Sequence, residues 1–220
     1  PSRQFLHIPS KALAHAIALE WDMQKDAVEP STMPLMSLAS TALDLTKVDM
    51  KFVRDNVLRY LPNDTTCYHA DPSTERVLLR KQKATWGPIH KFILSNTPLK
   101  VAPAISNSLT LTRNGLQHEP ELIALANTYV NSLDHWYLTL LQSAVVESKS
   151  FLVGVCYLHR GITPTEAIHA GRVEEEFQLE QWGLVEGGHD LDRLNAGVSM
   201  MSVRAFMDLL ELKEEEGESM

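Results

Sequence analysis

The sequence EPELIALANTYVNSLDHWYLTLL, residues 119–141, carries the clearest secondary-structure signal in the chain. Its apolar residues recur every three or four positions, at Leu122, Leu125, Ala126, Tyr129, Leu133, Trp136, Tyr137, Leu140 and Leu141. That spacing places them on one face of an α-helix. Pro120 suits the first turn, where a missing N–H costs no hydrogen bond. The stretch predicts one long helix with a buried face, and it favours a mainly α-helical fold.

A second helical signal lies farther along, where Thr163-Pro-Thr-Glu166 forms a capping box. In this motif the first and fourth residues cap each other's backbone N–H groups, and proline suits the first helical position. We expect the helix that begins there to end at Trp182–Gly183, and a final helix to cover residues 191–216 after Gly187–Gly188. Gly161 is expected to end the preceding apolar segment in the left-handed conformation.

The N-terminal half gives weaker signals for several shorter helices. Prolines separate them, and Ser10 and Asp49 are residue types that cap helix starts. The expected helices cover residues 11–21, 35–45, 50–61, 72–86 and 88–96, and a short strand is expected at 65–69. The predicted fold class is therefore mainly α, a multi-helix domain with minor short β segments.

Residues 1–9 form an extended lead-in that contains Phe5, Leu6 and Ile8 and ends in a proline. An extended segment of this kind needs a partner strand for stability, which indicates that a further N-terminal piece belongs to the protein. Because the chain begins at Pro1 rather than Met, we expect a processed or excised chain, from which any targeting peptide would already be gone.

The composition argues against several classes of partner. The 220 residues include 20 Lys and Arg against 28 Asp and Glu, a formal net charge of −8. Nucleic acids and anionic membrane surfaces both select basic proteins, so neither is expected as a partner. No apolar stretch approaches the roughly 20 residues that a bilayer span needs. The composition indicates an acidic globular protein with no membrane insertion.

The motifs of common catalytic sites are missing from the sequence. It contains no nucleophile elbow, P-loop, dinucleotide-binding fingerprint or paired-cysteine metal motif, and Cys67 and Cys156 stand in contexts typical of inert buried thiols. Glu166 and His169 have the Glu-x-x-His spacing of carboxylate-bridged metal sites, and His189–Asp190 could add ligands, but a di-iron bundle needs two such motifs. We expect no catalytic residue, no metal and no cofactor, with an acidic helical enzyme or carboxylate/His metal-binding protein as the alternative.

The densest polar cluster is VEEEFQLEQWGLVE, residues 173–186. On a helix Val173 and Phe177 line one stripe, and Glu176 and Glu180 lie one turn apart at its edge. Two like charges at this spacing are mildly unfavourable unless a cation stabilises them. That cation could belong to an outside partner, or to a Lys or Arg of a neighbouring helix, and the sequence leaves both possibilities open.

The four tryptophans, Trp21, Trp86, Trp136 and Trp182, stand near the ends of expected helices. Large aromatic residues usually anchor a core, and the indole N–H finds a local acceptor there. Exposed use at a binding surface is the alternative, because interfaces favour tryptophan. Trp182 is interpreted as a core residue that terminates its helix.

An ordered set of short motifs runs along the chain. The motifs are Ile8-Pro-Ser10, Leu13-Ala14, Glu20-Trp-Asp22 with Gln24, Thr32-Met-Pro-Leu35, Ser37-Leu38, Thr41-Ala-Leu-Asp44, Asp64-Thr65, Cys67-Tyr68, Trp86-Gly-Pro88, Glu174-Glu-Glu-Phe-Gln178, Trp182-Gly183, Glu186 and His189-Asp190. Together they resemble one family, the mitochondrial assembly chaperones for the α subunit of F(1)-ATPase. The resemblance spans about residues 5–192. The residues by themselves favour a binding protein over an enzyme, and the resemblance adds a named partner.

The resemblance implies a small β-rich N-terminal domain followed by a helical one. Residues 1–9 would then be the last strand of the truncated first domain, and residues 10–220 the helical chaperone domain with an acidic C-terminal tail. It also implies a monomeric protein of the mitochondrial matrix, whose transit peptide is removed. Such a protein is not an enzyme; it binds the unassembled α subunit, prevents its aggregation and hands it to the α/β hexamer.

The family's acidic stretch maps onto five glutamates of this chain. The expected partner-binding residues are Glu176, Glu180, Glu174, Glu175 and Glu186, with the first two singled out by their place on the helix. The expected structural core of the family motif consists of Trp21, Phe177, Trp182 and Asp190.

Overall fold

The computed structural model describes residues 6–108, 115–183 and 189–212. Helices make up nearly all of the regular structure in these ranges. They are α1 Lys11–Asp22, α2 Pro34–Ser40, α3 Met50–Leu58, α4 Arg76–Asn96, α5 Pro120–Ser132, α6 His135–Ser148, α7 Phe151–Leu158, α8 Pro164–Ala170, α9 Val173–Trp182 and α10 His189–Glu211. A single parallel bridge, between Tyr68 and Ser106, is the β pairing found within the described ranges. The predicted fold class is confirmed.

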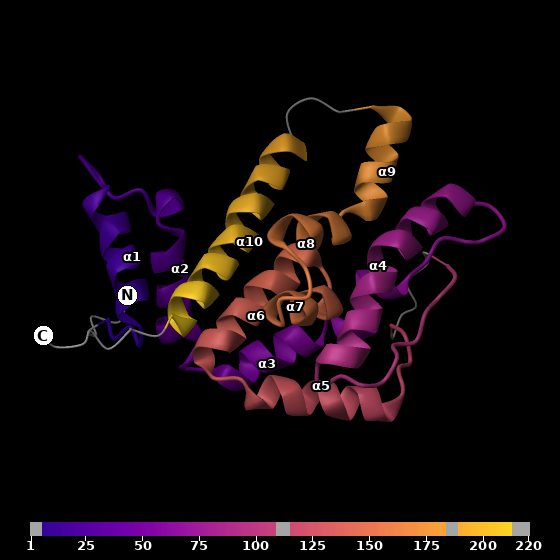
Figure 1. Ribbon diagram of the computed structural model, residues 1–220, viewed down its shortest axis with the longest axis horizontal. Helices are drawn as coiled ribbons and strands as arrows, with labels where there is room; N and C mark the ends of the chain where they lie inside the picture. Colours follow the sequence, from indigo (N-terminus) through magenta and orange to yellow (C-terminus); the bar gives the residue numbers. More distant parts are fainter. Residues whose placement is uncertain (1–5, 109–114, 184–188, 213–220) are drawn as a thin grey trace, which may run out of the picture.

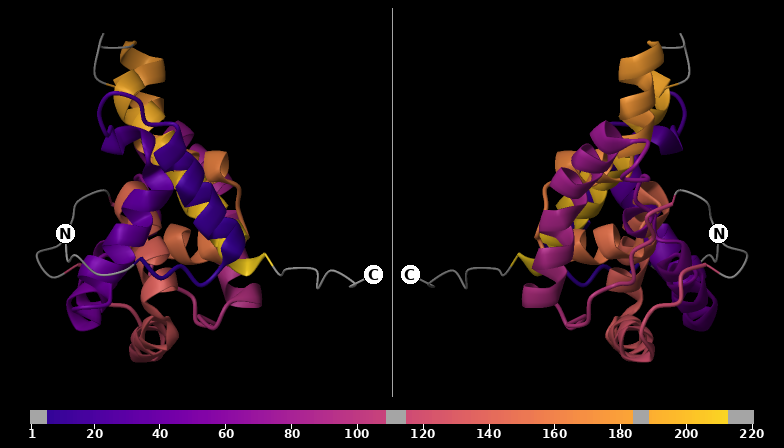
Figure 2. Two further views of the ribbon diagram at one scale, coloured as in Figure 1. Left: turned by 90° about the vertical axis from the view of Figure 1, so that its left-hand side faces the viewer. Right: turned by 90° about the vertical axis from the view of Figure 1, so that its right-hand side faces the viewer.

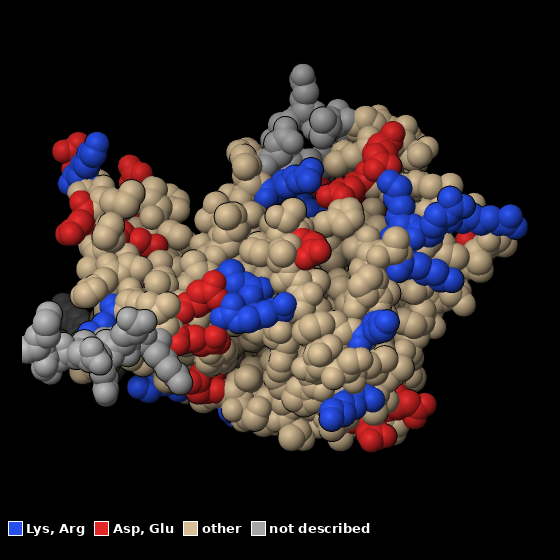
Figure 3. All heavy atoms as spheres, in the orientation of Figure 1, with Lys and Arg blue, Asp and Glu red and all other residues tan. Residues whose placement is uncertain are grey.

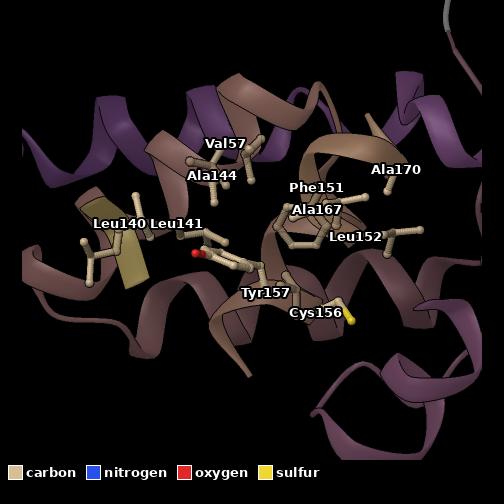
Figure 4. Close-up of a cluster of buried hydrophobic side chains, with 14 of the residues drawn as sticks. Val57, Leu140, Leu141, Ala144, Phe151, Leu152, Cys156, Tyr157, Ala167 and Ala170 are labelled. Carbon is tan, nitrogen blue, oxygen red and sulfur yellow. The ribbon is translucent and has the colours of Figure 1, made fainter. Parts of the chain in front are cut away.

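The hairpin of α6 and α7 forms the centre of the molecule (Figure 1). The long helix α10 packs along α6 and α8 on one side and along α1 and α2 on the other, as Figures 1 and 2 show together. The central buried cluster in Figure 4 includes Val57, Leu140, Leu141, Ala144, Phe151, Leu152, Cys156, Tyr157, Ala167 and Ala170. The buried Tyr157 hydroxyl donates to the Met200 carbonyl of α10 at 2.5 Å, which fixes α10 on the hairpin.

The predicted caps are confirmed. The Ser10 hydroxyl accepts from the backbone N–H of Leu13 at the start of α1, and the Asp49 carboxylate accepts from Phe52 at the start of α3. Thr163 and Glu166 form both hydrogen bonds of the capping box at the start of α8. Helix starts are predictable because each cap depends on groups only three residues apart.

The long helix predicted over residues 119–141 is wrong, because the structure divides it into α5 and α6. Leu133 is extended, with φ −75° and ψ 138°, and the Asp134 carboxylate caps α6 by accepting from Tyr137. The helical periodicity continues across the break, so it did not reveal that a capping residue restarts the helix.

The helix predicted from Thr163 to Trp182 is likewise divided, into α8 and α9, at Gly171 and Arg172. A Cβ on Gly171 would lie 2.8 Å from the carbonyl oxygen of Ser148. The corner therefore packs directly on the end of α6. Gly183 ends α9 as predicted, with a φ of +82° that glycine adopts without strain.

Two expected helices, residues 72–86 and 88–96, are one continuous helix α4 that begins at Arg76. Pro88 lies inside it and removes one backbone hydrogen bond. The helix continues because its apolar face is buried on both sides of the proline, through Leu78, Leu79, Trp86, Ile89 and Ile93. The Trp86 indole N–H also donates to the Ala170 carbonyl at 2.8 Å.

The short strand predicted at 65–69 is wrong. Residues Thr65–Cys67 form a 3-10 turn, because the Asp64 carboxylate accepts from the backbone N–H of Thr66 and closes the chain locally. Only Tyr68 takes part in a β bridge there, among the residues that are described.

The expectation for Gly161 is also corrected, because the left-handed residue at the end of α7 is Arg160, with a φ of +60°. Arg160 is held there by ion pairs with Asp208 and Glu211 of α10. Gly161 is instead required by close packing, since a Cβ would lie 2.5 Å from the Phe92 ring and 2.7 Å from the Cys156 sulfur.

The remaining expectations fall at the two ends of the chain. Residues 6–9 carry no helix or strand, and residues 1–5 lie outside the described ranges. The division at residues 1–9 and 10–220 therefore stays a prediction. Gly187–Gly188 and the acidic tail from residue 213 also lie outside the described residues, whereas α10 confirms the final helix.

A buried polar cluster joins the two halves of the chain around Asp64. Its carboxylate accepts from Thr66 N–H at 3.0 Å, Thr66 hydroxyl at 2.8 Å, Ser150 hydroxyl at 2.7 Å and Leu152 N–H at 2.9 Å. Burial raises the pKa of Asp64, and the hydrogen bonds act in the opposite direction. The Thr66 hydroxyl lies 2.9 Å from His90 Nε2; since its hydrogen is on Asp64, the ring nitrogen is the donor.

We predict that Asp64→Ala lowers the free energy of unfolding by about 3 kcal/mol or more, because it leaves several buried donors without an acceptor. Chemical denaturation with urea measures the effect. Asp71→Ala is the matched control: Asp71 is exposed and accepts from the backbone N–H and hydroxyl of Ser73 beside it, so its loss should change the free energy of unfolding far less than the loss of Asp64. Equal effects of the two variants would contradict the central role of Asp64.

We predict that the free energy of unfolding falls as the pH decreases from 6.5 to 4. Burial lowers the pKa of His90 to about 4, so between these values the unfolded state binds the proton that the folded state excludes. His90→Gln should flatten this dependence by roughly 2 kcal/mol, while His15→Gln at an exposed position should leave it unchanged. Denaturation curves at a series of pH values test this, and parallel profiles for wild type and His90→Gln would contradict it.

Candidate partner-binding site

The acidic helix α9 lies at one end of the molecule, packed against α4 (Figure 1). Its carboxylates gather beside Lys and Arg side chains of α4 on the face shown in Figure 3. Val173 is buried, and Phe177 is half-buried with the Lys81 ammonium 5.9 Å from its ring centroid. The helix is therefore held by one apolar edge and by charge pairs with its neighbours.

Glu176 makes its contacts within the chain. One carboxylate oxygen lies 2.5 Å from Nδ1 of His169 on α8. The other oxygen, Oε1, lies 3.7 Å from a guanidinium nitrogen of Arg193 on α10, which is too long for a hydrogen bond. That oxygen is buried and has no hydrogen-bond partner in the described structure. Glu176 thus connects three helices but keeps one acceptor unused.

The neighbouring glutamates are also paired. Glu180 accepts from Lys81 of α4 at 2.6 Å, and Gln82 of the same helix donates to Glu174 at 2.8 Å. Burial raises the pKa of Glu174. Glu175 forms an ion pair with Arg172, 3.3 Å away.

These contacts show how the expected site residues are arranged. Glu174, Glu175, Glu176 and Glu180 all have cationic or amide neighbours inside the chain, so the internal pairing that the sequence left open is observed. Glu186 lies outside the described residues. The hypothesis that these carboxylates contact a partner stays a prediction. To bind a partner, they would have to exchange their neighbours within the chain for a cation of that partner.

The interpretation of two tryptophans as core residues is wrong. Trp182 is 80% exposed and Trp21 is 46% exposed. Trp182 lies on the last turn of α9, where the helix extends past its packing partners, so its large apolar surface gains no burial there. Phe177 is half-buried as an edge residue, and the side chain of Asp190 is outside the description.

Under the alternative hypothesis of an enzyme or metal-binding protein, Glu166 and His169 would be site residues, but both make other contacts in the structure. The Glu166 carboxylate accepts from the N–H and hydroxyl of Thr163, and His169 contacts Glu176. Within the described ranges no three His, Cys, Asp or Glu residues are grouped so that they could hold a metal ion. Burial raises the pKa of Cys67, and it raises that of Cys156 to about 12, so neither thiol is a ready nucleophile.

A feature that the sequence analysis missed is an apolar groove beside α9, between α8 and α10. It encloses about 680 Å³ and is lined by Thr165, Ile168, His169, Arg193, Leu194, Gly197, Val198 and Met201. We call it the α8–α10 groove. The sequence does carry a signal for it, because residues 191–203 place apolar side chains on two faces of one helix. A helix that packs on a core with one side needs only one apolar face.

Comparison with known proteins shows which family this sequence and fold resemble. The sequence model of the family described as ATP12 chaperone protein matches residues 1–94. The crystal structure of Atp12 from Paracoccus denitrificans superposes with a TM-score of 0.86 at 26% identity, covering 96% of this chain and 87% of that one. The resemblance predicted from the sequence is confirmed. This chain is a relative of the ATP12 chaperones.

Two fungal ATP12 proteins show the same relationship at the level of sequence. The mitochondrial protein atp12 of Schizosaccharomyces pombe is 27% identical over 199 residues, 87% of this chain and 67% of its own length. The mitochondrial ATP12 of Saccharomyces cerevisiae is 27% identical over 218 residues, 82% of this chain and 66% of its own length. The chain thus spans about two thirds of these two ATP12 proteins.

Among the described residues of this ATP12 relative, no helix is long and apolar enough to cross a membrane.

The ion pairs of α9 should contribute little to stability, because partly exposed pairs are typically worth about 0–1 kcal/mol. We predict that Glu176→Gln combined with Glu180→Gln lowers the free energy of unfolding by only about 1 kcal/mol, as measured by urea denaturation. A loss as large as that of Asp64→Ala would show that both glutamates are structural.

Proposed function

We propose that this protein binds the unassembled α subunit of F(1)-ATPase, prevents its aggregation and hands it to the α/β hexamer. The proposal rests on one observation above all, the match to ATP12 proteins in sequence over 87% of the chain and in fold over 96% of it. The family supports an assembly-chaperone role, and the α subunit is the partner that the sequence resemblance implies. We place the protein in the mitochondrion because its two fungal relatives are named mitochondrial. The matrix location, the monomeric state and the lack of a cofactor are part of the proposal.

The physical demand on such a protein is clear. A subunit of a closed oligomer exposes large, partly apolar interfaces until its neighbours arrive, and these interfaces aggregate when they meet in solution. A chaperone must cover one of them and still be displaced by the true neighbour. Contacts that are individually weak and exchangeable serve this purpose.

The glutamates of α9 have that character. Glu180 and Lys81 are each about half exposed, so a lysine or arginine of the client can replace Lys81 with little net loss. Oε1 of Glu176 lies 3.7 Å from the largely exposed Arg193, without a hydrogen bond, so a client cation could take the place of Arg193 there. We propose Glu176 and Glu180 as the principal contacts, with Glu174, Glu175 and Glu186 adding to the negative field around them.

The decisive first experiment is suppression of aggregation. Isolated F(1)-ATPase α subunit is diluted from denaturant with and without the chaperone, light scattering is followed, and the mixture is separated by size-exclusion chromatography. We expect suppressed scattering and a soluble complex of the two chains. Undiminished aggregation, with the two chains eluting separately, would contradict the proposed function.

We predict that Glu176→Lys combined with Glu180→Lys weakens binding of the α subunit about 10-fold or more, because client cations then meet like charges. Binding is measured by calorimetry, and circular dichroism checks that the fold is intact. The matched control is Glu119→Lys with Glu121→Lys at the start of α5, far from α9 in Figure 1, which makes the same change in net charge. Equal weakening by both variants would show that only net charge matters.

A further inference from the structure

The helix α10 has two apolar faces, and the fold uses only one of them. The buried face packs into the core through Ala196, Met200, Val203, Phe206 and Met207, none of them more than 1% exposed. The other face carries Leu191, Leu194, Val198 and Met201, which are 52–66% exposed. A surface helix needs one apolar stripe for its core, so a second stripe indicates a second binding partner.

These four side chains form a continuous stripe. Their spacing of three, four and three residues keeps them within one side of the helix, and ten residues at 1.5 Å each give a length of about 15 Å. Three residues of the stripe, Leu194, Val198 and Met201, line one wall of the α8–α10 groove, and Ile168 of α8 is part of the other wall. A Cβ placed on Gly197 between them would meet nothing within 4 Å, so an approaching chain has room.

The end of the groove next to α9 is charged. His169 and Arg193 line it there, and both contact Glu176. Oε1 of Glu176 is buried without a hydrogen-bond donor. The Arg193 side chain is largely exposed, so a lysine or arginine of an incoming segment could take its place beside Glu176 and supply this donor, whereas an acidic residue would meet the carboxylates of α9.

The geometry points to the α8–α10 groove as the binding site for one amphipathic α-helix of the unassembled client. That helix places apolar residues at positions i, i+3 or i+4, and i+7 against the α10 stripe and a lysine or arginine at the α9 end, beside Glu176. The inference rests on the proposed function and specifies it further. A groove between two helices fits a third helix of about three turns, the helix-in-groove mode of recognition.

A client helix fits this surface better than a second copy of the chain. Each copy has a net charge of −8, so self-association would bring two acidic molecules together. A client segment with a basic end instead complements α9. Its apolar side would otherwise be exposed, so the groove would cover an aggregation-prone surface.

The test changes the stripe without changing charge. Leu194→Gln combined with Val198→Gln should weaken binding of isolated F(1)-ATPase α subunit about 10-fold or more and abolish suppression of its aggregation. The matched control is Leu45→Gln combined with Val48→Gln, two apolar residues that are 64% and 77% exposed near α3, and it should bind within about twofold of wild type. Thermal unfolding checks that both variants keep the wild-type fold.

The outcomes separate the two proposals. If wild-type chaperone fails to bind the α subunit, the proposed function falls, and this inference falls with it. If wild type binds and the groove variant binds equally well, the groove is excluded while the proposed function stands.

A photo-crosslinker at Met201 identifies the occupant. We expect it to label a helical segment of the α subunit with the stated apolar spacing and a basic end. Labelling of a second copy of the chaperone, or of an extended segment, would overturn the inference.

Discussion

A buried carboxylate, Asp64, joins the two halves of the chain, and the rest of the fold depends on this connection. Its hydrogen bonds to Thr66 hold the 3-10 turn before α4, and its hydrogen bonds to Ser150 and Leu152 hold the start of α7. The start of α7 sets the α6–α7 hairpin, on which α10 and α8 pack. Removing the acceptor would leave these donors buried and unpaired, so one side chain far from the surface controls the elements that build it.

The hairpin in turn decides what the surface presents. Tyr157 and the ion pairs of Arg160 fix α10, whose core face is then fully used. Its second apolar face is left beside α8, and the corner at Gly171 directs α9 toward α4. The acidic helix and the apolar groove are therefore adjacent because one scaffold positions both, and the candidate surface is a single site with a charged part and an apolar part.

Both parts suit reversible binding of the proposed client, an unassembled subunit. Ion pairs at a half-exposed surface exchange partners at small net cost, and an apolar stripe of four side chains offers affinity without the large contact of a permanent interface. The true neighbour of the client, with a larger and better-packed interface, can then displace the chaperone. A rigid, deeply buried site would bind more tightly, but it would oppose release.

The sequence by itself determined the features that depend on neighbours along the chain. The caps at Ser10, Asp49 and Thr163, the acidic helix that ends at Gly183 and the family resemblance were all readable, because each signal lies within a few residues. Tertiary structure alone decided where α5 ends and α6 begins, why α4 continues through Pro88, and that Trp182 is exposed. It also decided that Glu180 meets Lys81, 99 residues away in sequence, and that α10 has a free apolar face. These outcomes depend on burial summed over distant segments, and a local pattern cannot show which of its apolar faces another helix will cover.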